Sequence, residues 1–133
     1  MDLKKYKDFA TSIERLEEAY IKTTENKNGE YYSFFRDSAI QRFEFTVEIF
    51  WKLLKSAIKD QEGIICNSPK SCIREFFVSG YIKEDLAKLL LEMIDDRNMT
   101  SHTYHEEVAE IIFSRLKSYI DGMKYANESF GKH

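Results

Sequence analysis

Apolar side chains recur along the chain at three- and four-residue steps, the spacing of one face of an α-helix. The first such pattern predicts a helix over Leu3–Thr24, followed by a turn at Asn28 and Gly29. The second predicts a long helix over Tyr32–Gln61, ending before Gly63. Its main apolar stripe consists of Ile40, Phe43, Val47, Phe50, Leu54 and Ala57. Because this helix is apolar over more than one face, we expect it to pack against neighbours on more than one side.

Three further helices are indicated in the second half of the chain. Ser68 and Pro69 form a typical helix start, with serine as the cap and proline in the first helical position, and Gly80 ends this short helix. Two acidic residues favour the start of a fourth helix over Glu84–Met99, and a fifth is expected over Tyr104–Phe130. The pattern therefore predicts an all-α fold: an up-and-down antiparallel four-helix bundle with an additional short helix, in a single domain over residues 1–133.

Composition agrees with a folded helical domain and adds one unusual feature. The 133 residues are 43% hydrophobic and 32% charged, and one proline with five glycines leaves little material for the turns of an all-β fold. Ten Phe, eight Tyr and one Trp are many rings for so small a core, so we expect some at an interface. The net charge of −3 does not indicate a general nucleic-acid binder, so RNA chemistry would need a local basic pocket.

Cys66 and Cys72 have no Cys/His cluster around them, and we expect two reduced, partly buried thiols. The N-terminal residues lead into amphipathic sequence rather than the apolar core of a signal peptide. No apolar run approaches the roughly 20 residues that a membrane helix needs. These features predict a soluble, cytoplasmic protein.

The most informative segment is Asp95–Glu106, at the junction of the last two expected helices. Asp95 and Asp96 lie near the C-terminal end of a helix, where each negative charge opposes the helix dipole by about 0.3–1 kcal/mol. Residues that break a local rule often belong to functional sites. Pairing with Arg97, or continuation of the helix, would also explain them.

Thr103 and Glu106 have the spacing of a capping box, which predicts that Thr103 caps the last helix. His102 would then lie just outside a helix N-terminus, where the positive end of the dipole lowers the pKa of its imidazole. A neutral histidine can accept a proton as a general base. Tyr104 would lie in the first turn with its hydroxyl exposed.

Arg97 and His102 are five residues apart, so in an unbroken helix their side chains diverge by roughly 140°. They can converge only if the helix breaks between them or if a second subunit supplies one of them. A guanidinium offers a planar fork of donors that suits a phosphate or a phosphoryl transition state. The alternative is ordinary: an arginine near a helix end and a solvated loop histidine.

A metal site can be imagined from the acidic and histidine side chains of this segment, Asp95, Asp96, His102, His105 and Glu106. The two histidines are three residues apart and lack the motif of a zinc protease, so we expect no metal. The chain also lacks a phosphate-binding loop, a dinucleotide-binding glycine motif and a nucleophile elbow. We therefore expect no cofactor.

The segment Arg97–Tyr104 matches the R-x-x-x-x-H-x-Y motif of HepT-like proteins, a branch of the HEPN superfamily, with the polar Asn98 after the arginine. The segments Phe43–Lys52, Ser68–Pro69 and Ile73–Glu75 extend the likeness, in order, to proteins called nucleotidyltransferase substrate-binding proteins. The resemblance covers nearly the whole chain. The motif alone is a weak signal, whereas the ordered set is specific.

The resemblance implies a homodimer, or a higher homo-oligomer, that binds a minimal nucleotidyltransferase encoded nearby. In such toxin–antitoxin pairs the motifs form a metal-independent ribonuclease, and the partner silences it by transferring AMP to a tyrosine. By position, Arg97 would stabilise the scissile phosphate of an RNA such as tRNA, His102 would be the acid/base, Asn98 would orient the site and Tyr104 would accept AMP. Supporting roles are expected for Asp96, Glu44 and Glu48. The alternatives are a non-catalytic substrate-binding subunit of a two-component nucleotidyltransferase and a plain helical interaction module.

Overall fold

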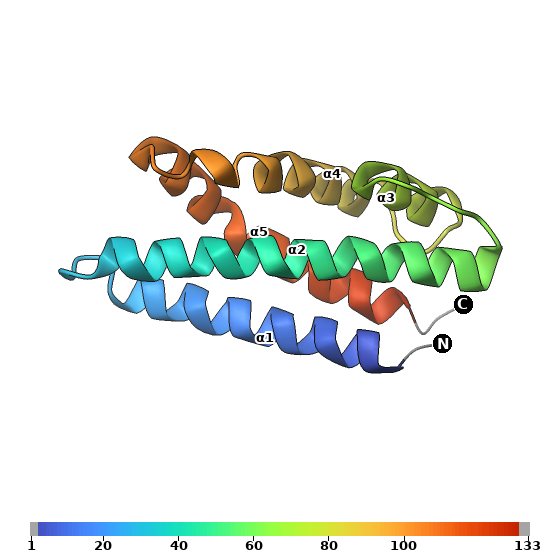
Figure 1. Cartoon of the computed structure of the whole chain (residues 1–133), viewed down its shortest axis with the longest axis horizontal. Coiled ribbons are helices and arrows are strands. Elements are labelled where there is room, and N and C mark those ends of the chain that lie inside the picture. The colour runs from blue at the N-terminus through green and yellow to red at the C-terminus, as the bar shows by residue number, and fades with distance from the viewer. Residues whose placement is uncertain (1–2, 131–133) are drawn as a thin grey trace.

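The computed structural model describes residues 3–130, and these form five α-helices and one short 3₁₀ helix without a strand (Figure 1). The all-α expectation is confirmed, and each expected helix is present. The elements are α1 Leu3–Glu25, α2 Tyr32–Glu62, α3 Pro69–Val78, α4 Glu84–Asn98, η1 Thr100–His102 and α5 Glu106–Ser129. None of these described helices is long and apolar enough to cross a membrane.

The helix ends follow local chemistry. Ser68 caps α3: its hydroxyl accepts a hydrogen bond from the Ser71 backbone N–H, and the Ser71 hydroxyl accepts one from the Ser68 backbone N–H. Pro69 takes the first helical position, as expected. At the end of α2, Gly63 has a φ of 67° and donates to the Lys59 carbonyl. Glycine adopts this left-handed conformation without the steric cost that a side chain brings.

Helices α1 and α2 run antiparallel along the length of the molecule, and α3, α4 and α5 complete the packing around them (Figure 1). The core forms where their apolar faces meet. Phe9 of α1 stacks on Phe50 of α2 with ring centroids 5.4 Å apart, and Phe43 of α2 stacks on Tyr119 of α5 at 5.7 Å. Close packing of this kind buries the apolar stripes that predicted the helices.

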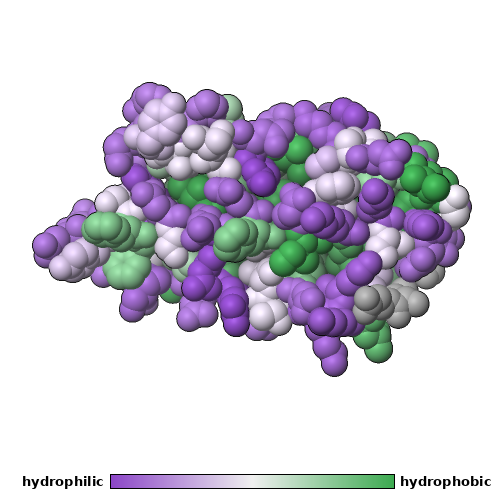
Figure 2. Space-filling model, viewed as in Figure 1, coloured by the Kyte–Doolittle hydropathy of each residue, from purple (hydrophilic) through white to green (hydrophobic). Residues whose placement is uncertain are grey.

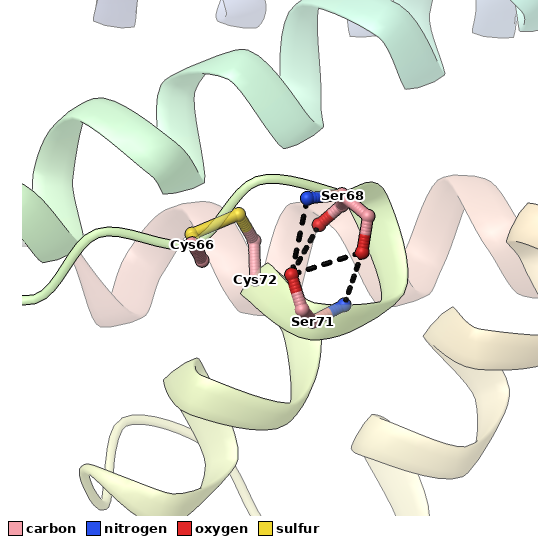
Figure 3. Close-up of a disulfide and its surroundings, with 4 residues drawn as sticks. All are labelled: Cys66, Ser68, Ser71 and Cys72. Carbon is pink, nitrogen blue, oxygen red and sulfur yellow. Dashed lines mark hydrogen bonds between the residues drawn. A yellow bond between two sulfur atoms is a disulfide. The ribbon is translucent and has the colours of Figure 1, made fainter.

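The prediction of two free thiols is wrong: Cys66 and Cys72 form a disulfide (Figure 3). The loop after α2 turns back over the first turn of α3, which brings the two Cα atoms to 5.2 Å, within the range that a disulfide spans. Both sulfur-bearing residues are buried. The sequence has no Cys/His cluster that would indicate pairing, and the path of this loop cannot be read from the sequence.

Candidate functional site

The Arg97–Tyr104 motif lies where α4 ends and the chain turns towards α5. The Met99 N–H donates to the carbonyls of Asp95 and Asp96, at 3.2 and 3.0 Å, and the His102 N–H donates to the Met99 carbonyl at 3.0 Å. The Thr100 hydroxyl donates to the Arg97 carbonyl at 2.7 Å, which occupies an acceptor that a continuing helix would use. The α-helix therefore gives way to η1 between Arg97 and His102, the break that their convergence requires.

This break places the motif residues at different depths. Arg97 is half-buried, Asn98 and His102 are exposed, and Tyr104 is 75% exposed. The rings of His102 and Tyr104 lie 6.2 Å apart between centroids, and Tyr104 lies 4.3 Å from the ring of His105. Within residues 3–130, no hydrogen bond or ion pair joins Arg97 to His102. The turn thus brings His102 and Tyr104 together, without bonding either to Arg97.

The predicted capping box at Thr103 is wrong. The Thr103 hydroxyl donates to the Thr100 carbonyl at 3.0 Å, and the N-cap position of α5 belongs to His105, without a side-chain hydrogen bond. Because α5 begins at Glu106, His102 does not lie at the helix N-terminus on which the expected dipole effect depended. The capping box does not form because tertiary packing gives Glu106 another partner: its carboxylate binds an arginine of α2.

That arginine is Arg36, whose side chain is only 2% exposed. Its guanidinium donates to Glu106 at 2.6 Å and to Glu110 at 2.9 Å, and it pairs with Asp37 at 3.1 Å. The hydrogen bonds to Glu106 contribute most to raising the pKa of Arg36, against the opposing effect of burial. The hydrogen bond and positive charge of Arg36 lower the pKa of the Glu106 carboxyl. Three carboxylates therefore compensate one buried cation beside the motif.

Tyr32 extends this network, because its hydroxyl donates to Glu110 at 2.6 Å. Burial, followed by this hydrogen bond, raises the pKa of Tyr32 to about 12. Burial also pushes the pKa of Glu110 upwards, but the hydrogen bonds from Tyr32 and Arg36 bring it below its usual value. Arg36 was not among the site residues expected from the sequence. The signal was its position four residues before Ile40, on the apolar stripe of α2, where a cation needs buried partners.

Asp96 faces α5 instead of the turn. Its carboxylate accepts hydrogen bonds from Arg115 at 2.9 and 3.1 Å and from the buried Tyr119 hydroxyl. Burial and the bond to Asp96 raise the pKa of Tyr119. Asp95 pairs with Lys70 at 2.6 Å. The acidic pair before Arg97 is thus explained by cations of neighbouring helices, and Asp96 anchors the end of α4 that carries Arg97.

The other expected supporting residues are separate from the turn. Glu44 and Glu48 are half-buried on α2, and Glu48 pairs with Lys52 at 3.5 Å. In the part of the chain that the structure describes, no hydrogen bond or ion pair connects either glutamate to Arg97, His102 or Tyr104. The same described residues contain no group of three His, Cys, Asp or Glu side chains arranged to hold a metal ion.

The chain is similar in sequence and in fold to known proteins. A relative from Haemophilus influenzae named probable ribonuclease HepT is 31% identical over 86 residues, which are 62% of this chain and 58% of the relative, so less than two thirds of that protein is matched. A solved structure from Haemophilus influenzae, described as the fold of a substrate binding domain of a nucleotidyltransferase, superposes with a TM-score of 0.81 at 20% identity, covering 94% of this chain and 98% of the other. A tri-AMPylated HEPN toxin of Shewanella oneidensis, in complex with an MNT antitoxin, superposes with a TM-score of 0.74 at 16% identity over 100% of both chains.

The two structural likenesses show a shared fold, at identities too low to show more. A family model matches more of this sequence than the probable ribonuclease HepT does. The model described as "nucleotidyltransferase substrate binding protein like" matches residues 4–132, which include all of α1 except Leu3, every later helix and the whole motif. The chain therefore belongs to the family of nucleotidyltransferase substrate binding protein-like proteins.

Proposed function

We propose that this protein is a HepT-like, metal-independent ribonuclease toxin of the cytoplasm, silenced when a minimal nucleotidyltransferase transfers AMP to Tyr104. Two relatives support this, because one is named a probable ribonuclease and another is a HEPN toxin that carries AMP in complex with its antitoxin. The proposed RNA substrate is tRNA, and the proposed cleavage needs no cofactor.

In the proposed reaction His102 removes the proton of an RNA 2′-hydroxyl, which attacks the neighbouring phosphorus. The bond to the 5′-oxygen breaks, that oxygen takes up a proton, and the product is a 2′,3′-cyclic phosphate. Arg97 stabilises the charge that develops on the phosphate, and Asn98 orients the site by hydrogen bonding. Such a reaction needs only proton transfer and electrostatic stabilisation.

One observation carries the proposal: the ring of Tyr104 is exposed and lies 6.2 Å from that of His102. In silencing, the Tyr104 hydroxyl loses its proton to solvent, its oxygen bonds to the α-phosphorus of ATP, and pyrophosphate leaves. The added AMP is anionic and bulky, and it occupies the turn beside His102. It both blocks access to the histidine and repels the phosphates of an approaching RNA. Because Tyr104 lies close to His102, the transfer of AMP to the tyrosine inhibits the reaction at the histidine.

The active form is proposed to be a homodimer, or a higher homo-oligomer, of up-and-down four-helix bundles. No bond joins Arg97 to His102 within the described part of one chain, so a second copy can complete each site with its own motif. Asp96 supports the motif by holding the end of α4, through its bonds to Arg115 and Tyr119. A supporting role is also proposed for Glu44 and Glu48, although they lie on α2 and are not bonded to the motif within the described part of one chain.

A second function is favoured by the family's own description, which names substrate binding and no catalysis. In that case the chain is a non-catalytic subunit that presents a substrate to the nucleotidyltransferase. Tyr104 is then itself the group presented, and Arg97 and His102 serve only to bind. This alternative predicts transfer of AMP to Tyr104 but no cleavage of RNA.

The decisive experiment is cleavage of a total tRNA pool by the purified protein in the presence of a metal chelator. His102→Ala should abolish cleavage, whereas His105→Ala, which removes the neighbouring exposed histidine, should retain it. Fragment ends should carry the 2′,3′-cyclic phosphate. Equal cleavage by the wild type and His102→Ala would reveal a contaminating nuclease. No cleavage by wild-type protein whose Tyr104 is unmodified would favour the binding-subunit alternative.

A further inference from the structure

A groove runs along the outer seam between α1 and α2, the two helices that lie side by side in Figure 1. It consists of two adjoining hollows of about 490 Å³ each, which share Ser12, Arg15 and Ile49 as lining residues. A third hollow of about 300 Å³ continues it past Arg42 to Lys22. From Lys5 to Lys22 the groove follows α1 for about 25 Å.

The groove is basic, although the chain as a whole carries a net charge of −3. Its charged lining residues are the cations Lys5, Arg15, Lys22, Arg42 and Lys52 and the anions Asp8 and Glu18. Five positive groups against two negative ones make this seam a local reversal of the overall charge. It provides the local basic surface that a polyanion needs on an acidic protein.

Within the described residues, Lys52 is the one groove cation that takes part in an ion pair, with Glu48 at 3.5 Å. In the described part of the chain, Arg15 and Arg42 take part in no ion pair, and the guanidinium of Arg42 donates a hydrogen bond to the Arg15 carbonyl, at 3.5 Å. Lys5 reaches the hydroxyl of Ser56 at 3.4 Å instead of a carboxylate. By contrast, Arg36 is bound by carboxylates on three sides. Cations that the fold leaves uncompensated are available to an anionic ligand.

The floor of the groove adds a stacking surface between these charges. Phe45 is 57% exposed, and the half-buried Ile49 lies beside it in the lining. Figure 2 shows apolar groups along the middle of this face, over α2, with hydrophilic groups around them. A positively charged groove with an exposed aromatic ring is the combination that holds single-stranded nucleic acids, since phosphates pair with the cations and bases stack on the ring.

The groove is separate from the motif. Among the described elements, η1 packs against α2, α4 and α5 but not against α1, and in Figure 1 the turn that contains η1 lies across α2 from α1. Occupation of the groove therefore leaves His102 and Tyr104 accessible. An extended strand held there is anchored outside the turn, while another part of the same molecule reaches the motif.

We propose that the α1–α2 groove binds a single-stranded segment of RNA, with its phosphates on Arg15, Arg42, Lys5 and Lys52 and a base stacked on Phe45. The choice of RNA among polyanions rests on the proposed function, but binding in the groove requires no cleavage. An acidic surface of a protein partner is the competing occupant. The exposed ring of Phe45 offers a face on which an RNA base can stack, and the test distinguishes RNA from a protein partner.

The test is fluorescence anisotropy with a short, fluorescein-labelled single-stranded RNA whose riboses are 2′-O-methylated, so that it cannot be cleaved through the 2′-hydroxyl. The double variant Arg15→Glu/Arg42→Glu should weaken binding on the order of 100-fold at low salt, and Lys5→Glu/Lys52→Glu should weaken it comparably. Phe45→Ala should cost on the order of tenfold. Circular dichroism and thermal unfolding of each variant check that the fold is kept.

The matched control is Lys59→Glu/Arg74→Glu, which makes the same change in net charge at exposed cations outside the groove. It should change affinity by less than about threefold. Equal losses in control and groove variants would mean a general charge effect and overturn the proposal. So would groove variants that keep RNA affinity but lose self-association or the complex with the nucleotidyltransferase, because the groove would then be a protein interface.

This test also separates the groove from the ribonuclease proposal. His102→Ala should bind the RNA as the wild type does while failing to cleave tRNA. Groove-dependent binding without cleavage by the wild type would overturn the ribonuclease alone. Cleavage and binding that are both indifferent to Arg15, Arg42 and Phe45 would overturn the groove alone.

Discussion

The guanidinium of Arg36, in the first turns of α2, lies 2.6 Å from the carboxylate of Glu106, the first residue of α5. This contact joins residues 70 positions apart in the sequence. It fixes the point at which the chain leaves the turn that carries His102 and Tyr104. At the other side of the turn, Asp96 holds the end of α4 through Arg115. The motif is thus an exposed turn between two anchored helix ends.

Replacing Arg36 with Met keeps the apolar part of the side chain and removes the cation. Because Glu106, Glu110 and Asp37 lose their shared partner, the free energy of unfolding should fall by about 1–2 kcal/mol. Urea denaturation measures this, and hydrogen exchange should speed up over residues 99–106. The control, Arg74→Met, removes an exposed arginine and should stay within about 0.5 kcal/mol of the wild type. Equal effects of the two substitutions would contradict the anchoring role of Arg36.

Lowering the pH should weaken the same contact. Hydrogen bonding to Arg36 holds the pKa of Glu106 below 4.5, and hydrogen bonds from Tyr32 and Arg36 do so for Glu110 against the effect of burial. A carboxyl whose pKa is lower in the folded state contributes stability that is fully present above about 4.5 and is lost as the pH falls through its folded value. Urea denaturation from neutral pH downwards should show this loss.

Arg36→Met provides the comparison for the pH series, since other carboxyls titrate in the same range. The variant should lose less stability than the wild type between neutral pH and the region below 4.5. Parallel curves for the two proteins would show that Arg36 does not lower these pKa values.

The helices could be read from the sequence, whereas the caps around the motif could not. Phe9, Ile13 and Leu16 follow helical spacing and are all buried in the structure, because the spacing itself records which face meets the core. The capping box failed because a residue that fits a local motif can have a stronger distant partner. Glu106 had the right spacing from Thr103, but only the packing of α2 against α5 brings Arg36 to it.

The residues of the candidate site were likewise only partly predictable from the sequence. The motif residues were found from their order along the chain, since the likeness is one of sequence. The residues that hold the motif in place could not be found in this way, because the bonds of Asp96 to Arg115 and Tyr119 depend on how α4 packs on α5. Asp96 was recognised as unusual for its place near a helix end, but its partners are on another helix.

The disulfide should stabilise the loop between α2 and α3. Closing the short segment from Cys66 to Cys72 restricts the unfolded chain, and the expected contribution is about 2 kcal/mol. A reducing agent should therefore lower the melting temperature of the wild type measured by circular dichroism. The variant Cys66→Ser/Cys72→Ser should melt at the same temperature with or without reductant. Two reactive thiols in protein purified without reductant would show that the bond does not form.

Tyr104→Phe should separate the two activities proposed for the turn. Phenylalanine retains the ring beside His102 but lacks the oxygen that accepts AMP, so the variant should cleave tRNA and stay active after incubation with the nucleotidyltransferase and ATP. The control is Tyr125→Phe, which removes another exposed tyrosine, on α5, and should still be silenced. Peptide mass spectrometry should find AMP on the peptide containing residue 104 in the control and not in Tyr104→Phe. If Tyr104→Phe is silenced as readily as the wild type, the acceptor is another residue. Distance to His102 would then no longer explain inhibition.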